Sequence, residues 1–329
     1  MSLRIDIYDK GEEIPDVVER DIFHSKELFL IFEKTSGFKP FMFAVSDGER
    51  CLVRLLAYVQ RDRSVFSHSF VKRCVVYGCG DFVPDLLPEE KERVFEFLLN
   101  EFTQQMMKKA FVMEFRNLDN ALFGYKAFHD NHFIPINWLR VRNSLHGGKN
   151  VDQRFSTSRL RQIRKGIKNG AVVEIAHKTE DVKAFAQMLK RVYSSHIRKY
   201  FPDKDFFHHL FDVWHDEGKT KIIIVRYKQK IIGGAVCLYS GENAYLWFSG
   251  GMRKTYPLQY PGVLSIWKAL EDAQKDGYQH FEFMDVGLPF KRHGFRDFVL
   301  RFGGKQSSTR RWFRFRWKWL NRFLDLLYS

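Results

Sequence analysis

The stretch TKIIIVRYKQKIIGGAVCLYSG, residues 220–241, places two apolar runs on either side of a short polar segment. Runs of this length that are rich in Ile and Val predict two β-strands joined as a hairpin. Helical patterns precede this hairpin, and a strand, a helix and a further strand follow it. These segments lie at 182–193 and 206–215, and then at 244–251, 261–277 and 280–285.

The first half of the chain repeats this order of elements. Its segments are a helix at 25–34, a hairpin at 40–62 around Asp47 and Gly48, a strand at 73–80, a helix at 88–109 and a strand at 110–117. A repeated order of elements predicts a duplicated unit with a mixed α/β sheet. A polar stretch at 144–158 separates the copies, so we expect domains at residues 1–145 and 146–329.

The charge of the chain predicts an acidic partner. The 329 residues include 54 Lys and Arg against 39 Asp and Glu, a formal net charge of +15. Such an excess attracts nucleic acid, an anionic lipid surface or a phosphorylated substrate. The four cysteines lack paired spacing, so we expect neither disulfides nor a metal site. The polar start and the lack of a long apolar run predict a cytoplasmic protein.

The segment FEFMDVGLPFKRHGFRDFVLRFGGK, residues 281–305, predicts a strand, a basic loop and a second strand. Asp285 stands where the first strand leaves the core. A high density of cations attracts phosphate or carboxylate groups, and it is also compatible with a basic hairpin that faces solvent. The cations of this segment are Lys291, Arg292, His293, Arg296 and Arg301.

Two further basic segments fit ordinary surface structure. STSRLRQIRKGIKNG, residues 156–170, predicts a helix whose cations, Arg159 among them, form a solvated face. In RRWFRFRWKWL, residues 310–320, aromatic residues from Phe313 to Trp319 alternate with basic ones. That period of two favours a half-buried strand over a nucleic-acid or membrane patch.

At this point the chain resembles a known superfamily. The phrases RQIRKGIKNGAVVEIA at 161–176, KIIGGAVCLYSGENAYLWFSGG at 230–251 and GFRDFVLRFGG at 294–304 are similar to those of GNAT acetyltransferases. Their order resembles that of the Fem-type (FemAB-like) aminoacyl- and peptidyltransferases. The resemblance covers most of 155–319 and, more faintly, 23–117, so it implies two tandem GNAT-like domains.

The resemblance implies transfer of an acyl or aminoacyl group to an amine of a cell-envelope or polysaccharide precursor. Its donor would be aminoacyl-tRNA or an acyl-CoA, used as a substrate, and no bound cofactor is expected. The implied partners are a phosphorylated small-molecule or lipid-linked precursor, tRNA and an anionic membrane surface, whereas DNA is not implied. The reaction needs a neutral amine and a group that stabilises the developing oxyanion.

Two positions depart from the patterns of these families. Val299 stands where Fem-type enzymes commonly place a lysine near the reacting carbonyl, so Arg301, Arg296 or Lys291 would supply the positive charge, or aminoacyl-tRNA is not the donor. The coenzyme A loop of GNAT enzymes, Gln/Arg-x-x-Gly-x-Gly/Ala, is not found after 244–251. These departures favour a rival hypothesis, a non-catalytic GNAT-fold protein that binds an acidic polymer, a nucleotide-sugar or tRNA.

The candidate site residues follow from these segments and from the resemblance. Asp285, Arg296 and Arg301 are the candidate catalytic residues, with Asp285 either accepting the proton of the amine or capping the next turn. The resemblance implies that Arg198 and Tyr200 bind a phosphate. The other candidates for substrate binding are Tyr245, Trp247, Tyr256, Lys291 and Arg292, of which the aromatic residues in 244–251 also fit a sheet core.

Overall fold

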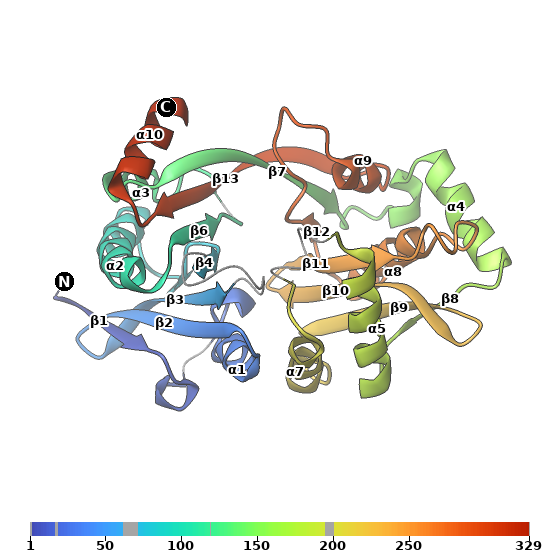
Figure 1. Ribbon diagram of the computed structural model, residues 1–329, viewed down its shortest axis with the longest axis horizontal. Helices are drawn as coiled ribbons and strands as arrows, with labels where there is room; N and C mark the ends of the chain where they lie inside the picture. The colour runs from blue at the N-terminus through green and yellow to red at the C-terminus, as the bar shows by residue number, and fades with distance from the viewer. Residues whose placement is uncertain (1, 17–18, 62–71, 119, 195–200, 329) are drawn as a thin grey trace. The chain divides into compact units, whose positions relative to one another are not determined.

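The computed structural model describes residues 2–16, 19–61, 72–118, 120–194 and 201–328. The chain divides into two compact units (Figure 1). Unit 1 comprises Met1–Trp138 and Ser308–Ser329, and unit 2 comprises Leu139–Ser307. The C-terminal segment thus groups with the N-terminal part of the chain, because β13 (Lys305–Phe315) pairs antiparallel with β6 (Val112–Arg116). The expected domains at 1–145 and 146–329 stay a prediction. They assign the C-terminal segment to the second domain, whereas Ser308–Ser329 belongs to unit 1.

The sheet of unit 1 has the strand order β1-β2-β3-β4-β6-β13, and β5 pairs with β3. Neighbouring strands are antiparallel except β4 and β6, which are parallel. The strands not yet delimited are β1 (Leu3–Tyr8), β2 (Phe38–Asp47), β3 (Arg50–Arg61), β4 (Lys72–Tyr77) and β5 (Asp81–Phe82). The expected hairpin at 40–62 is present, with Asp47 opposite Arg50.

Helices α1, α2 and α3 of unit 1 bury apolar residues. Helix α2 contributes Val94, Leu98 and Phe102 at helical spacing to a core that also contains Phe43 and Phe115. The helical segments are η1 (Gly11–Glu13), η2 (Ile22–His24), α1 (Lys26–Lys34), α2 (Pro88–Lys109), α3 (Tyr125–Asp130) and α10 (Lys318–Tyr328).

The sheet of unit 2 has the order β7-β12-β11-β10-β9-β8. Only β11 and β12 pair in parallel. The strands are β7 (Ile134–Ser144), which unit 2 shares from Leu139 onward, β8 (Val172–Ile175), β9 (Thr220–Tyr227), β10 (Lys230–Ser240), β11 (Asn243–Gly251) and β12 (His280–Phe283).

The helices of unit 2 cover both faces of its sheet. Gly233 and Gly234 are consecutive in β10, so their side-chain directions point to opposite faces. A Cβ atom on Gly233 would meet Pro261 of α8, and one on Gly234 would meet Phe185 of α5. Helices α5 and α8 therefore lie on opposite faces. The helical segments are η3 (Val151–Arg154), α4 (Thr157–Lys168), α5 (Thr179–Val192), α7 (Lys204–Trp214), α8 (Pro261–Lys275) and α9 (Gly294–Leu300).

Each unit contains the same supersecondary element, a parallel strand pair joined by a helix. In unit 1 the pair is β4 and β6 with α2 between them, and in unit 2 it is β11 and β12 with α8 between them. An antiparallel hairpin precedes the pair in both units, β2–β3 in one and β9–β10 in the other. The mixed α/β fold with a repeated order of elements is therefore confirmed.

The expected second strand within 281–305 is wrong. The segment after β12 is an irregular loop followed by helix α9, and β13 begins only at Lys305. Phe295, Phe298, Val299 and Phe302 recur at the i, i+3, i+4, i+7 spacing of a helix, and all four pack in or against the core of unit 2. The helical period therefore prevails over the local β propensity of the phenylalanines.

The C-terminal aromatic segment follows its expected strand only in part. Strand β13 extends to Phe315, whereas Trp317 and Trp319 lie beyond it, at the start of α10, and are exposed. Among the described residues, no helix is long and apolar enough to span a membrane. The cysteines are free thiols, buried at Cys74, Cys79 and Cys237 and half-buried at Cys51.

Unit 1 buries a carboxylate among arginines. Glu114 of β6 has no exposed surface and accepts hydrogen bonds from Arg116 Nε and Arg311 Nη1, each at 3.0 Å. Arg73 of β4 pairs with it as well. These contacts join three adjacent strands of the unit 1 sheet through one side chain, and a buried charge of this kind is stable only while its partners are present.

We expect Glu114→Ala to lower the free energy of unfolding by about 3–5 kcal/mol, because it leaves buried guanidinium groups without their carboxylate. Urea unfolding followed by circular dichroism measures the change. Glu242→Ala, at an exposed position in the β10–β11 turn, is the control and should stay within about 0.5 kcal/mol of the parent. Equal stability of the two variants would contradict the stabilising role of the buried Glu114 carboxylate.

Candidate active site

The parallel pair in unit 2 is open at one end. Pairing between β11 and β12 runs from Asn243 opposite His280 to Leu246 opposite Phe283, where β12 ends. Strand β11 continues to Gly251. The register on its other side, against β10, shifts at Trp247, which is a β-bulge. Residues 247–251 therefore present an edge without a β12 partner, and such an edge can bind an extended ligand.

Small residues bring the N-terminus of α8 close to this open edge. A Cβ atom on Gly251 would lie 2.6 Å from the backbone nitrogen of Gly262, and one on Gly233 would lie 2.6 Å from Pro261. Tyr260 adopts the left-handed conformation, with φ 47°, as the N-cap, and Pro261 is the first helical residue. The first turn of α8 contains no acidic residue. Its N–H groups and helix dipole therefore favour an anion.

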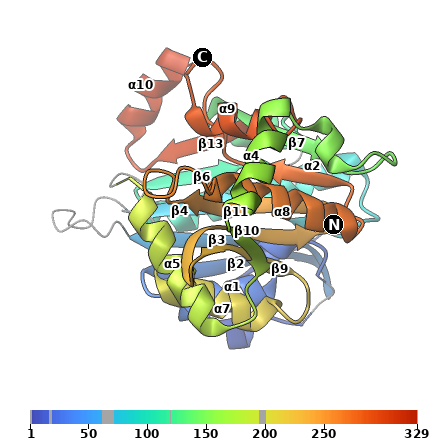
Figure 2. The same cartoon turned by 90° about the vertical axis from the view of Figure 1, so that its right-hand side faces the viewer.

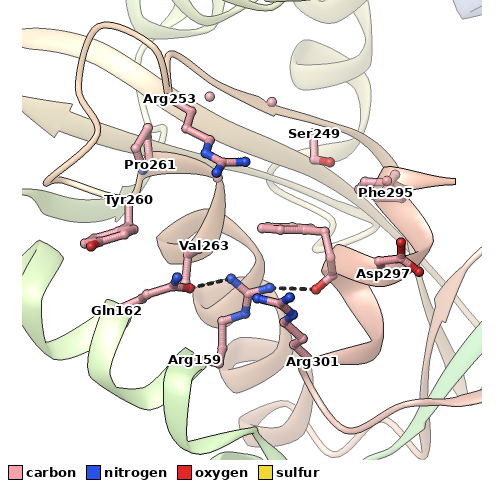
Figure 3. A pocket seen from close by; sticks show the side chains of 15 residues that line it. Arg159, Gln162, Ser249, Arg253, Tyr260, Pro261, Val263, Phe295, Asp297 and Arg301 are labelled. Atoms are coloured by element: carbon pink, nitrogen blue, oxygen red, sulfur yellow. Dashed lines mark hydrogen bonds between the residues drawn. The ribbon is translucent and has the colours of Figure 1, made fainter.

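A cavity of about 560 Å³ lies between the end of β11, the N-terminus of α8 and helix α9 (Figure 3). Three arginines from different segments line it: Arg159 of α4, Arg253 of the loop before α8, and Arg301 at the end of α9. Among the described residues, none of the three forms an ion pair with a carboxylate. Asp297 is the acidic residue among the described lining residues.

Arg159 is the buried member of this cluster, with 2% of its surface exposed. Its guanidinium donates to Gln162 Oε1 and to the carbonyl of Phe298, both at 2.7 Å, and lies 4.4 Å from the ring centres of Phe298 and Phe302. Burial, together with the nearby charges of Arg301 and Arg253, lowers the pKa of Arg159 to about 10. The cavity thus holds uncompensated positive charge, which a phosphate or carboxylate would stabilise.

Unit 1 lacks these features at the corresponding position. Strands β4 and β6 are paired from Arg73 to Tyr77, so no open edge remains at the end of β4. Helix α2 carries Glu89 and Glu90 in its first turn, and Glu90 accepts a hydrogen bond from the backbone N–H of Leu87 at 3.0 Å. These acidic groups interact favourably with the N-terminal end of the helix and would repel an anion. The described residues thus place a candidate active site in unit 2.

The structure brings some of the sequence-predicted residues to this cavity. Arg301 lines it. Arg296 lies in α9, but its guanidinium donates to the carbonyls of Leu288 and Lys291, both at 2.7 Å. These contacts hold the loop before α9, so Arg296 has a structural part that the sequence did not indicate, and its catalytic role stays a prediction.

The other predicted residues that the structure describes do not line the cavity. Lys291 and Arg292 are exposed in the loop before α9, and Asp285 is exposed shortly after β12. Tyr245 is buried in β11, and Trp247 packs on Phe206 with ring centres 5.3 Å apart. Tyr256 packs against Tyr227. Arg198 and Tyr200 lie outside the described residues. The roles assigned to all these residues stay predictions.

Sequence reasoning missed Arg159 and Arg253. Arg159 was interpreted as part of a solvated face, yet it shares a buried helix face with Ile163 and Gly166 at i, i+4 and i+7. That spacing was the available signal. The first half of the coenzyme A loop pattern is present at the N-terminus of α8, where Gln259 and Gly262 fit Gln/Arg-x-x-Gly. The second half is not, because Leu264 replaces the final small residue.

Val299, the position of the Fem-type lysine, faces the core. Its side chain has no exposed surface and packs in the main apolar cluster of unit 2. A lysine in this orientation would bury its charge at a large cost. Arg301, two residues later, is exposed and lines the cavity instead.

Tyr193, at the end of α5, closes part of the open edge. Its hydroxyl donates to the carbonyl of Ser249 at 2.9 Å and accepts from the backbone N–H of Ser249 at 3.3 Å. Burial raises the pKa of Tyr193 to about 12, so the hydroxyl stays protonated. One side chain therefore satisfies the backbone groups that a neighbouring strand would otherwise bind.

Comparison with known proteins identifies unit 2. Residues 154–292 match the family model described as acetyltransferase (GNAT) domain. This segment is similar to the acetyltransferase (GNAT) domain family. The match covers the cavity walls formed by α4, β11 and α8, and it confirms the expected class, an acyltransferase of the GNAT superfamily. No curated protein matches the chain in sequence.

Solved structures confirm the tandem GNAT fold. FemX is similar over 93% of this chain and 94% of its own, with 12% identity and a TM-score of 0.63. A tandem GNAT protein from the clavulanic acid biosynthesis pathway matches over 86% and 85%, with 9% identity and a TM-score of 0.56. L-PGS from Bacillus licheniformis matches over 95% and 98%, with 12% identity and a TM-score of 0.54. The expected likeness to Fem-type proteins is confirmed at the level of the fold.

We expect Arg296→Ala to lower the free energy of unfolding by about 1–3 kcal/mol, because it removes charge-assisted hydrogen bonds to the loop before α9. Lys291→Ala is the matched control from the exposed part of the same loop and should change stability by less than about 0.5 kcal/mol. Thermal and urea unfolding measure both variants. A neutral Arg296→Ala would show that these contacts do not stabilise the loop.

We expect Tyr193→Phe to increase amide hydrogen exchange at Ser249, because the backbone groups there lose their hydroxyl partner. The loss in stability should be about 1 kcal/mol, the net worth of a typical hydrogen bond. Hydrogen–deuterium exchange read by mass spectrometry on peptides from β11 gives the result. Tyr125→Phe, at a residue that is 43% exposed in unit 1, controls for the removal of a hydroxyl. Unchanged exchange at Ser249 would show that the Tyr193 hydroxyl does not protect the open edge of β11.

Proposed function

We propose that this protein transfers an acyl or aminoacyl group from a phosphate-bearing donor to an amine. The observation that carries the proposal is the cavity in the GNAT domain, where Arg159, Arg253 and Arg301 surround the N-terminus of α8 beside the open edge of β11. Both donors under consideration, acyl-CoA and aminoacyl-tRNA, carry phosphate groups. The arginines would hold these phosphates.

In the proposed reaction the acceptor nitrogen attacks the carbonyl carbon of the donor. A C–N bond forms, and the C–S bond of a thioester or the C–O bond of an aminoacyl ester breaks. The proton of the amine passes to a base, for which Asp285 is the proposed group, and the leaving thiolate or alkoxide takes up a proton. Backbone N–H groups on the open edge of β11 would stabilise the oxyanion.

We propose an amine of a cell-envelope or polysaccharide precursor as the acceptor, with the reaction in the cytoplasm. The support is the fold shared with FemX and L-PGS, together with the net charge of +15, which suits a phosphorylated or lipid-linked precursor. Lys291 and Arg292 are exposed, and they lie a few residues before the cavity-lining residues of α9 in the chain. We propose that they attract this anionic acceptor.

Binding of adenosine 3′,5′-bisphosphate, the phosphate-bearing end of coenzyme A, tests the donor site. We expect Arg253→Gln to weaken binding by about tenfold or more, since a charge-assisted hydrogen bond is worth about 1.5–3 kcal/mol. Arg161→Gln is the matched control, because Arg161 is an exposed arginine of α4 outside the cavity lining. Isothermal titration calorimetry at low salt gives both dissociation constants. Equal weakening by both variants would indicate non-specific attraction and contradict the site.

Transfer itself is tested by incubating the protein with acyl-CoA or aminoacyl-tRNA and a set of amine acceptors, and by following product mass. We expect turnover with one donor class and its loss in Arg253→Gln. The rival, a binding protein without catalysis, is favoured by one observation, the buried Val299 in place of the Fem-type lysine. Tight binding of ligand without any transfer would support that rival and overturn the proposed reaction.

A further inference from the structure

The C-terminal helix α10 has one face that packs on the protein and one that does not. Asn321 lies on the packed face and is buried, and its side chain bonds both to the N–H of Phe315, at 2.8 Å, and to the carbonyl of Phe315, at 2.6 Å. Leu320 and Leu324 are half-buried on the same side. These contacts fix the rotation of α10 about its own axis.

The opposite face of α10 is apolar and exposed. Trp319, Phe323 and Leu326 follow the i, i+4, i+7 spacing of one helix face and are 63%, 56% and 81% exposed. Trp317, just before the helix, is 42% exposed, and its ring stacks on Trp319 with centres 5.7 Å apart. Four large apolar side chains in one patch are unusual on a surface that only water contacts.

Basic residues flank this apolar face. Arg316 precedes Trp317, and Arg322 lies one turn of the helix from Trp319; both are exposed. Figures 1 and 2 show α10 projecting beyond the end of β13. A helix with Trp, Phe and Leu on one face and cations beside it fits the interface of an anionic bilayer, where aromatic rings lie at the level of the headgroups.

We propose that α10 and Trp317 form a docking surface for an anionic lipid membrane. A lipid surface is favoured over a protein partner because two tryptophans and flanking arginines match an interface that is apolar below and negative above. The net charge of +15 adds long-range attraction to the same surface. The helix lies on the surface and does not span it, since its 11 residues are too few to cross a bilayer.

Vesicle flotation with the full chain tests this proposal. We expect the protein to bind vesicles of equal parts phosphatidylcholine and phosphatidylglycerol, and to bind phosphatidylcholine vesicles much less. Trp319→Ala combined with Phe323→Ala should lower binding to the anionic vesicles by about tenfold or more, because two apolar side chains no longer enter the interface. Arg322→Gln should lower it by about fivefold and act only on the anionic vesicles.

The control variants separate α10 from the rest of the surface. Leu122→Ala removes an exposed leucine of unit 1, 65% exposed, and should leave vesicle binding unchanged, whereas Leu326→Ala should weaken it. The binding of adenosine 3′,5′-bisphosphate should stay as in the parent in all α10 variants, so a failure of this proposal is distinct from a failure of the donor site. Circular dichroism confirms that each variant is folded.

Three outcomes would overturn the proposal. The parent protein could fail to bind anionic vesicles at low salt, or the α10 variants could bind as the parent does. In the third, the parent forms a dimer that the Trp319→Ala, Phe323→Ala variant does not form, while neither binds vesicles; the face would then be covered by a second copy of the chain.

Tryptophan fluorescence gives a second measurement. A blue shift of the emission on mixing with anionic vesicles, lost in the variant Trp317→Phe combined with Trp319→Phe, would place these rings in the membrane interface.

Discussion

The end of β12 at Phe283, five residues before the corresponding end of β11, is the constraint on which the candidate active site depends. A parallel neighbour that ran the full length would saturate the edge of β11 and leave no space beside it. Because the partner stops, backbone groups near Gly251 face a cavity, and α9 forms its other wall. Arg296 of α9 donates to the carbonyls of Leu288 and Lys291, so it links the helix to the loop that precedes it.

Close approach of backbone to backbone is the second requirement. The N-terminus of α8 can lie against β10 and β11 only because Gly233 and Gly251 have no Cβ atoms at the contact. The helix then directs its positive end into the opening. The arginines add to this potential, and the aromatic rings of Phe298 and Phe302 stack on Arg159, which offsets part of the cost of burying a charge without a carboxylate.

The two units have the same supersecondary element but differ at the end of the parallel strand pair. Both units join a parallel strand pair through a helix, but the pair in unit 1 is fully paired, and its helix carries glutamates in the first turn. Unit 1 uses its buried polar groups differently, with three arginines around Glu114. That arrangement stabilises adjacent strands, whereas the three arginines that line the cavity of unit 2 form no ion pair with a carboxylate among the described residues.

The sequence by itself determined the repeated order of elements and the mixed sheet, because apolar periodicity and turn residues are local signals that short windows carry. The GNAT fold was expected from the resemblance of three sequence phrases to that superfamily. The sequence also singled out Arg301, which lines the cavity, while the catalytic role of Arg301 stays a prediction. Only the tertiary structure decided that 294–300 is a helix, that Arg159 is buried and lines the same cavity as Arg301, and that β13 pairs with β6. These features depend on partners distant in the chain: the exposure of a basic residue is set by what packs over its helix face, and the pairing of a strand by which edge it meets. A single sequence shows neither the packing over a helix face nor the edge that a strand pairs with.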